Sequence, residues 1–215
     1  MFANRTEAGE RLADALAKRK LTRPVVLALP RGGVPVAIPV ADRLGAPLDL
    51  LMVRKIGSPG NPELAAGAVV NGAAHQVVFN PGVLESYGLT PADFARAVQE
   101  KLAEIEVRRK KWLAGRAPVD VARRSVIVVD DGIATGSTVR AALKGLAGKG
   151  AKEIILAVPV APGDTLAELA PLADDILCLE TPTRFLAVGA HYAEFGQVAD
   201  DEVTALLAKR KEASE

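Results

Sequence analysis

Short, uninterrupted apolar runs divide the chain, and each is bounded by glycine, proline or charged residues. Runs of this length that are apolar throughout, rather than alternating with polar residues, are typical of parallel strands covered on both faces. We therefore predict buried parallel strands at residues 25–29, 48–53, 125–129, 154–158 and 176–179.

The segments between these runs carry apolar residues at helical spacing. An opening helix is predicted with Thr6 as its N-cap. Crossover helices are predicted at residues 34–44, 138–148 and 165–172. A strand, a crossover helix and a parallel strand, repeated along the chain, predict an α/β fold with a doubly wound, mainly parallel sheet.

The longest helix is predicted at residues 91–113, where apolar residues recur at helical spacing after Thr90 and Pro91. It ends in four basic residues, 108–111. We interpret them as a solvated helix end that complements the helix dipole, with an anion site as the alternative.

A small hairpin is predicted before this helix. Two short apolar runs, 66–70 and 76–79, are separated by Asn71 and Gly72, a pair typical of tight hairpin turns. The hairpin and the long helix together form an insertion in the α/β pattern.

The composition predicts one domain over residues 1–215, because 49% of the chain is apolar and can fill a core. A formal charge of +1 leaves no basic surplus for wrapping nucleic acid. No apolar stretch approaches the roughly 18 residues that cross a bilayer, and the polar start lacks the apolar region of a signal peptide. The single cysteine, Cys178, has no partner for an intramolecular disulfide and is interpreted as a buried residue. We therefore expect a cytoplasmic protein that binds neither nucleic acid nor a membrane.

The most informative segment follows the strand predicted at 125–129. It reads Asp130-Asp131-Gly132-Ile133-Ala134-Thr135-Gly136-Ser137-Thr138 and opens a helix. Ligands of open α/β sheets bind at the carboxyl ends of the strands. Gly136 allows close backbone approach, and the N–H groups at a helix N-terminus suit a phosphate. The hydroxyls of Thr135, Ser137 and Thr138 can donate hydrogen bonds to its oxygens.

The two adjacent carboxylates require a partner other than the phosphate. Asp130 and Asp131 can accept hydrogen bonds from the vicinal hydroxyls of a sugar, or hold a hydrated Mg²⁺. A phosphate and a diol on one small molecule describe a ribose 5-phosphate. The segment lacks the Gly-Lys-Ser/Thr ending of a P-loop and the Gly-x-Gly-x-x-Gly of dinucleotide binders. A small-residue turn with an aspartate cap is the non-functional alternative.

An apolar strand, paired acids and a small-residue loop ending in Thr-Gly-Ser-Thr resemble the signature of the type I phosphoribosyltransferase family. The resemblance extends from about residue 24 to about residue 198. It implies transfer of the 5-phosphoribosyl group from phosphoribosyl pyrophosphate to a nucleobase-like acceptor in nucleotide salvage, with Mg²⁺ and release of pyrophosphate. It also implies a core over about residues 1–179 and a small C-terminal hood over about 180–200. Some purine-specific members have an aspartate where this chain has Ala134, which argues against a 6-oxopurine acceptor.

The resemblance also assigns roles within the loop. Residues 135–138 would anchor the 5-phosphate, and Asp130 and Asp131 would accept the ribose hydroxyls and hold Mg²⁺ through water. The residues that would bind ribose 5-phosphate are Asp130, Asp131, Gly132, Ala134, Thr135, Gly136, Ser137 and Thr138.

A second loop, 29–33, lies between the first predicted strand and its helix. Arg31 suits a bidentate phosphate contact, and Gly32 and Gly33 allow the backbone to come close; an ordinary turn is the alternative. In the family a loop at this place binds pyrophosphate and often holds a non-proline cis peptide, which we predict between Pro30 and Arg31.

Arg54 and Lys55 end the strand predicted at 48–53 and precede a breaker-rich loop at 58–63. In the family a mobile loop in this region closes over the substrates and excludes water. The resemblance implies that Arg54 and Lys55 neutralise the departing pyrophosphate, with a solvated strand end as the alternative. The predicted catalytic residues are Arg31, Arg54, Lys55, Asp130 and Asp131.

The predicted hood collects scarce aromatic residues over 182–192. Family members often stack an aromatic side chain on the acceptor; Phe185 is the first candidate and Tyr192 the second, with a core role as the alternative. No general base is evident, which fits chemistry driven by leaving-group and oxocarbenium stabilisation.

The expected partners are phosphoribosyl pyrophosphate and a small-molecule acceptor, and a homodimer is one assembly open to the chain. A non-catalytic protein that senses phosphoribosyl pyrophosphate as a regulator is the alternative function. The sequence shows neither an added nucleic-acid domain nor a basic face that such a regulator would need.

Overall fold

A parallel five-stranded sheet forms the centre of the computed structural model, which describes residues 1–71 and 75–212. The strand order is β2-β1-β6-β7-β8, and every neighbouring pair is parallel. The strands are β1 (Val25–Ala28), β2 (Leu48–Leu50), β6 (Ser125–Val129), β7 (Glu153–Val160) and β8 (Asp175–Glu180). All five predicted runs are therefore strands of one sheet, with shifts at their ends.

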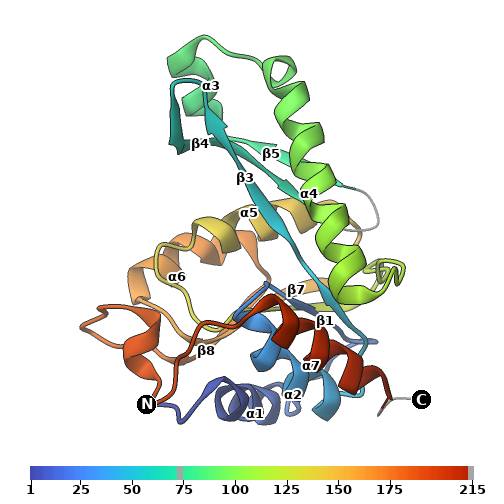
Figure 1. Cartoon of the computed structure of the whole chain (residues 1–215). Coiled ribbons are helices and arrows are strands. Elements are labelled where there is room, and N and C mark those ends of the chain that lie inside the picture. Colours follow the sequence, from blue (N-terminus) through green and yellow to red (C-terminus); the bar gives the residue numbers. More distant parts are fainter. Residues whose placement is uncertain (72–74, 213–215) are drawn as a thin grey trace.

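Helices cover both faces of this sheet (Figure 1). Alternate residues of a strand face the two layers: in β6, Ile127 and Val129 belong to one apolar core and Val126 and Val128 to the other. The first core is covered by α1 (Arg5–Leu16), α2 (Gly33–Arg43) and α7 (Asp200–Glu212), and the second by α5 (Ser137–Leu146) and α6 (Gly163–Leu169). The predicted α/β fold is confirmed.

The helix starts shift from the prediction, most clearly at α1 and α6. Asn4, not Thr6, caps α1, because its side chain accepts the backbone N–H of Glu7 at 3.0 Å. The helix predicted from residue 165 begins at Gly163 and ends at Leu169, followed by a 3₁₀ turn at η2 (Ala170–Leu172). Within the described ranges, no helix combines the length and the apolar composition needed to cross a membrane.

Between β2 and β6 the chain builds a second unit of three antiparallel strands and a long helix. Figure 1 shows β3 leaving the central sheet and running alongside α4. The strands pair in the order β3 (Val53–Ser58), β4 (Asn61–Val70), β5 (Gln76–Phe79). The helices are α3 (Pro81–Tyr87), η1 (Pro91–Phe94) and α4 (Ala95–Leu113), so the long predicted helix is confirmed after a 3₁₀ first turn.

Two predictions about this second unit are wrong. The strand predicted at 48–53 stops at Leu50, because after the buried residues Leu51 and Met52 the chain pairs with β4 instead of the central sheet. The segment 58–63 is not a long loop, because Gly60 at φ +75° makes a tight turn between β3 and β4.

The predicted hairpin is the pair β4–β5, and it is longer than expected because β4 begins at Asn61. Gly72, expected in its turn, lies outside the described residues.

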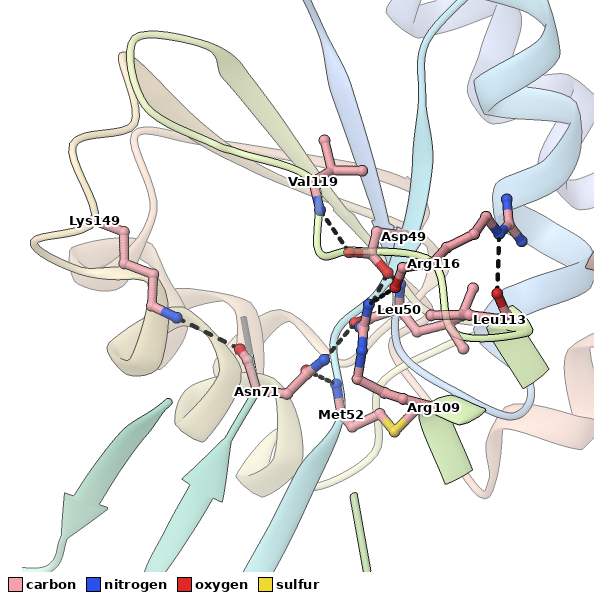
Figure 2. Close-up of polar contacts among 9 residues, drawn as sticks. All are labelled: Asp49, Leu50, Met52, Asn71, Arg109, Leu113, Arg116, Val119 and Lys149. Atoms are coloured by element: carbon pink, nitrogen blue, oxygen red, sulfur yellow. Dashed lines mark hydrogen bonds and ion pairs between the residues drawn. The ribbon is translucent and has the colours of Figure 1, made fainter. Parts of the chain in front are cut away.

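A buried polar network fixes this second unit to the central sheet (Figure 2). Asp49 of β2 accepts a hydrogen bond from Nη1 of Arg109 in α4 at 3.1 Å. Asn71, after β4, donates to the carbonyl oxygen of Leu50 at 3.0 Å and accepts the backbone N–H of Met52. The network joins β2, β4 and α4, so the position of β3 relative to the sheet edge is set by buried bonds.

Candidate functional site

The two loops singled out in the sequence lie side by side at the carboxyl edge of the sheet. β1 and β6 are neighbours, with Ala28 opposite Val129, so the loops that follow them leave the sheet together. Gly33 is closely packed there: a Cβ at this position would lie 2.7 Å from the carbonyl oxygen of Val129. The cis peptide predicted between Pro30 and Arg31 is present.

The hydroxyl-rich loop forms a cavity at the start of α5. Gly136 precedes the helix in the left-handed region, at φ +69°, which favours glycine. Thr135, Ser137 and Thr138 are exposed and, with Asp130 and the rest of residues 132–139, line a cavity of about 130 Å³. The first N–H groups of a helix lack intrahelical partners, so backbone donors and hydroxyls meet at one place suited to an anion.

The two carboxylates have different surroundings. Asp130 lies at the end of β6, and its Oδ1 accepts the backbone N–H of Asp131 at 2.9 Å. Burial, followed by the charge of Asp131, raises the pKa of Asp130 well above its ordinary value. Asp131 packs against Gly32, where a Cβ would lie 2.0 Å from Oδ2. Gly32 and Asp131 therefore bring the two predicted loops into contact.

Two residues that the sequence did not connect with Asp131 hold it in place. Nε of Arg5 donates to Asp131 Oδ2 at 2.7 Å, and the hydroxyl of Tyr192 donates to the Asp131 backbone oxygen at 2.5 Å. Neither contact has a local sequence signal, because the partners are 126 and 61 residues apart.

Tyr192 is buried and does not support the prediction that it stacks on an acceptor. Its ring packs against Phe2 and Phe195, with centroid distances of 5.3 and 4.9 Å. Burial, with the charge of Asp131 as the second cause, raises the pKa of the Tyr192 hydroxyl, which therefore stays protonated and keeps its donor role.

Phe185 belongs to the hood segment next to η3 (Val188–His191). Its ring stacks on that of His191, with centroids 5.6 Å apart and the planes 15° from parallel. Phe185 is partly exposed. Its contact with an acceptor stays a prediction.

The structure separates Arg54 from Lys55. They are successive residues of β3, so their side chains point to opposite faces. Arg54 approaches Glu104 at 3.7 Å; burial, and after it the charge of Arg108, lowers the pKa of Arg54. Lys55 instead lines a pocket of about 230 Å³ that also includes Ser137. The expectation that the pair ends a strand of the central sheet is wrong, because both residues lie in β3. Their joint role at the pyrophosphate stays a prediction.

Arg31 faces the C-terminal helix. Its Nη1 lies 3.4 Å from Oδ1 of Asp200, the first residue of α7, and Nζ of Lys111 lies 3.5 Å from Oδ2 of the same residue. The charge of Asp200 also acts on Arg54. Arg31, Arg54 and Lys111 therefore gather around one carboxylate.

The interpretation of residues 108–111 as a solvated helix end is wrong for Arg109, whereas Lys110 and Lys111 are exposed. Arg109 is 6% exposed and paired with Asp49, and Lys111 binds the acidic first turn of α7. Only a contact across the fold, which the local sequence pattern does not contain, distinguishes Arg109 from its solvated neighbours.

These features define a class: an α/β protein with an anion cavity, an acidic pair and a basic, glycine-containing loop at one sheet edge. Residues 4–193 match the family model described as the phosphoribosyl transferase domain. The chain belongs to that family.

Two relatives support this assignment. The Mycobacterium tuberculosis protein Rv0571c, provisionally named a phosphoribosyl transferase, is 44% identical over 207 residues, which are 96% of this chain and 46% of that protein. The chain thus spans about half the length of the curated relatives it matches. The crystal structure of TT1426 from Thermus thermophilus is 40% identical, with a TM-score of 0.83 and coverage of 97% of this chain and 98% of that one.

A more distant structure shares the fold alone. It is a hypothetical protein from Neisseria gonorrhoeae with bound ppGpp, 14% identical, with a TM-score of 0.53 and coverage of 95% of this chain and 92% of that one.

Proposed function

We propose that the chain is a phosphoribosyltransferase that transfers the 5-phosphoribosyl group of phosphoribosyl pyrophosphate to a nucleobase-like acceptor and releases pyrophosphate. The observation that carries the proposal is the contact of Asp131 with Gly32, which joins a diol-accepting acidic pair to a basic loop beside an anion cavity. Family membership supports the same activity. A phosphate, a diol and a second anionic group in one ligand match these three features.

The proposed roles follow from the chemistry of the side chains. The hydroxyls and N–H groups of residues 135–138 would hold the 5-phosphate, and Asp130 and Asp131 would accept the ribose hydroxyls. Arg31 and Arg54 would stabilise charge on the pyrophosphate as the bond from C1′ to its oxygen breaks. Lys55 lines a pocket together with Ser137, and its contact with the pyrophosphate stays a prediction.

The donor set fits a hydrated Mg²⁺ rather than a metal enclosed by protein. Among the described residues, no group of three or more His, Cys, Asp or Glu side chains could hold a metal ion. Mg²⁺ usually keeps several waters and binds through one or two carboxylates plus substrate phosphates, which Asp130, Asp131 and a pyrophosphate would supply. When bound, Mg²⁺ would neutralise charge on the leaving pyrophosphate.

Phe185 is the side chain of the hood proposed to contact the acceptor. Phe185 would contact the acceptor from the hood, because it is partly exposed, whereas Tyr192 is buried. A role in nucleotide salvage follows from a nucleobase acceptor.

A cytoplasmic location fits a chain whose single cysteine, Cys178, is unpaired, since disulfides belong to oxidising compartments. We propose one domain for the chain, with the insertion tied to the sheet by Asp49 and Arg109.

Calorimetric titration with phosphoribosyl pyrophosphate, with and without Mg²⁺, tests the donor site, and pyrophosphate release against a panel of bases tests transfer. We expect Mg²⁺-dependent binding and release with one acceptor. The Asp131→Asn variant should bind about 10-fold more weakly or worse, while Asp14→Asn, at an exposed ion pair, should bind normally. Binding without turnover on any base would favour the sensing protein, and no binding would refute the site assignment.

A further inference from the structure

Arg5 reaches the acidic pair from the far end of the chain. The backbone of Phe2 donates to the carbonyl of His191 and accepts the N–H of Ala193, both at 2.8 Å, which anchors the N-terminus on the hood. Asn4 then caps α1, and Arg5 is the first residue of that helix. The local fold thus places the Arg5 side chain between the hood and the carboxyl edge of the sheet.

The guanidinium of Arg5 is fixed from three directions. Nε donates to Asp131 Oδ2 at 2.7 Å, and Nη1 donates to the carbonyl oxygen of Gly196 at 2.8 Å. The group also lies over the ring of Phe195, 3.8 Å from its centroid, in a cation–π contact. The side chains of Arg5 and Asp131 are 12% and 15% exposed, so this is a largely buried, charge-assisted bond rather than a surface pair.

This arrangement fixes the Asp131 carboxylate on two sides. Oδ2 is taken by Arg5, and Gly32 packs against the same carboxylate. Two acids that are adjacent in sequence repel one another, and Arg5 places a positive charge in direct contact with Asp131.

We propose that Arg5 is a positioning residue of the ribose site: by holding Asp131 Oδ2 it fixes the orientation of the carboxylate that would accept a sugar hydroxyl. The inference rests on the proposed function and goes beyond it, because Arg5 lies outside both loops and outside every sequence motif. Arg5 acts on the ligand through Asp131 and does not touch the phosphate cavity, whose lining is Asp130 and residues 132–139.

The test compares ribose 5-phosphate with inorganic phosphate, both titrated calorimetrically into the full-length protein. The ratio of the two affinities measures the contribution of the sugar hydroxyl contacts. The affinity for phosphate alone measures the contribution of residues 135–138. For Arg5→Gln we expect about a 10-fold or greater loss for ribose 5-phosphate and an unchanged affinity for phosphate. Arg5→Lys should regain part of the loss because it restores the charge. Arg43→Gln, which removes an exposed ion pair with Asp14, should change neither affinity.

A double-variant cycle with Asp131→Asn separates positioning from general destabilisation. If Arg5 acts through Asp131, adding Arg5→Gln to the Asp131→Asn variant should not weaken the binding of ribose 5-phosphate any further. Additive losses, an unchanged ratio in Arg5→Gln, or an equal loss of phosphate and ribose 5-phosphate would each overturn the inference. A wild-type protein that binds ribose 5-phosphate no better than phosphate would overturn the proposed function as well.

Discussion

Asp130 holds a carboxyl group at the buried end of β6, where burial and the charge of Asp131 raise its pKa. The folded state therefore binds the proton more tightly than the unfolded state, in which the pKa is about 3.9. The resulting contribution favours folding at low pH and is lost as the pH rises from the unfolded to the folded pKa. Above the unfolded pKa, the burial of this carboxyl group therefore costs stability.

We accordingly expect Asp130→Asn to raise the thermal midpoint at pH 7, with a gain that disappears at about pH 3–4, where the unfolded aspartate is itself protonated. Thermal unfolding without divalent cations, followed from pH 3 to pH 8, measures this. A lower midpoint for Asp130→Asn at pH 7 would show that the charge of Asp130 stabilises the fold.

Gly32 tests whether the carboxylate of Asp131 must stay where it is. Gly32 has φ −59° and ψ −33°, which alanine adopts freely. The three atoms nearest to a Cβ there all belong to the Asp131 carboxyl group, with Oδ2 at 2.0 Å. Gly32→Ala should displace that carboxylate and weaken binding of ribose 5-phosphate about 10-fold, with little change in thermal midpoint. Gly163→Ala is the matched control, since a Cβ there meets Thr181 at an ordinary 3.5 Å. Equal binding by the Gly32→Ala variant and wild type would mean that Asp131 has room to move.

At the scale of elements, the acidic first turn of α7 faces the cations proposed for pyrophosphate. Oδ1 of Asp200 lies 3.4 Å from Nη1 of Arg31, and Oδ2 lies 3.5 Å from Nζ of Lys111. A bound pyrophosphate would compete with this carboxylate for Arg31. Asp200→Asn should therefore tighten the binding of inorganic pyrophosphate several-fold, and the gain should shrink with added salt because these side chains are about one-third exposed. Weaker binding in this variant would instead make Asp200 part of the ligand site.

The elements themselves were largely predictable, for a physical reason. Strands buried on both faces need continuous apolar runs, and those runs marked every strand of the central sheet. The failure at residues 48–53 has the same origin. Leu51 and Met52 are buried like strand residues, so their apolar character could not show that the chain leaves the sheet there.

At the scale of the whole molecule, the sequence located those parts of the candidate site that lie on single loops. In residues 130–138 and 29–33 the functional side chains are adjacent in the sequence, so a local motif reveals them. The structure brings both loops to one sheet edge. Arg5 and Asp200 were missed because their relevance depends on pairings across 126 and 169 residues. Such contacts are products of the completed fold and have no local periodicity.

The buried pair of Asp49 and Arg109 shows how the molecule joins its central sheet to the inserted unit. Their side chains are 7% and 8% exposed, and Asp49 also accepts the backbone N–H of Val119 at 2.9 Å (Figure 2). Arg109→Met keeps the apolar length of the side chain but leaves the carboxylate without its cation. Removing one partner of a buried ion pair costs about 3–5 kcal/mol, because the remaining charge is uncompensated.

We therefore expect Arg109→Met to lower the free energy of unfolding by about that amount in denaturant titrations. Arg96→Met, which removes an exposed pair with Glu100 on the same helix, should cost less than about 1 kcal/mol. Asp49 and Arg109 also fix the position of β3, which carries Arg54. The Arg109→Met variant should therefore lose more affinity for pyrophosphate, which Arg54 would bind, than for phosphate, which residues 135–138 would bind. Equal losses of both ligands would show that the pair supports the fold as a whole and not the placement of β3.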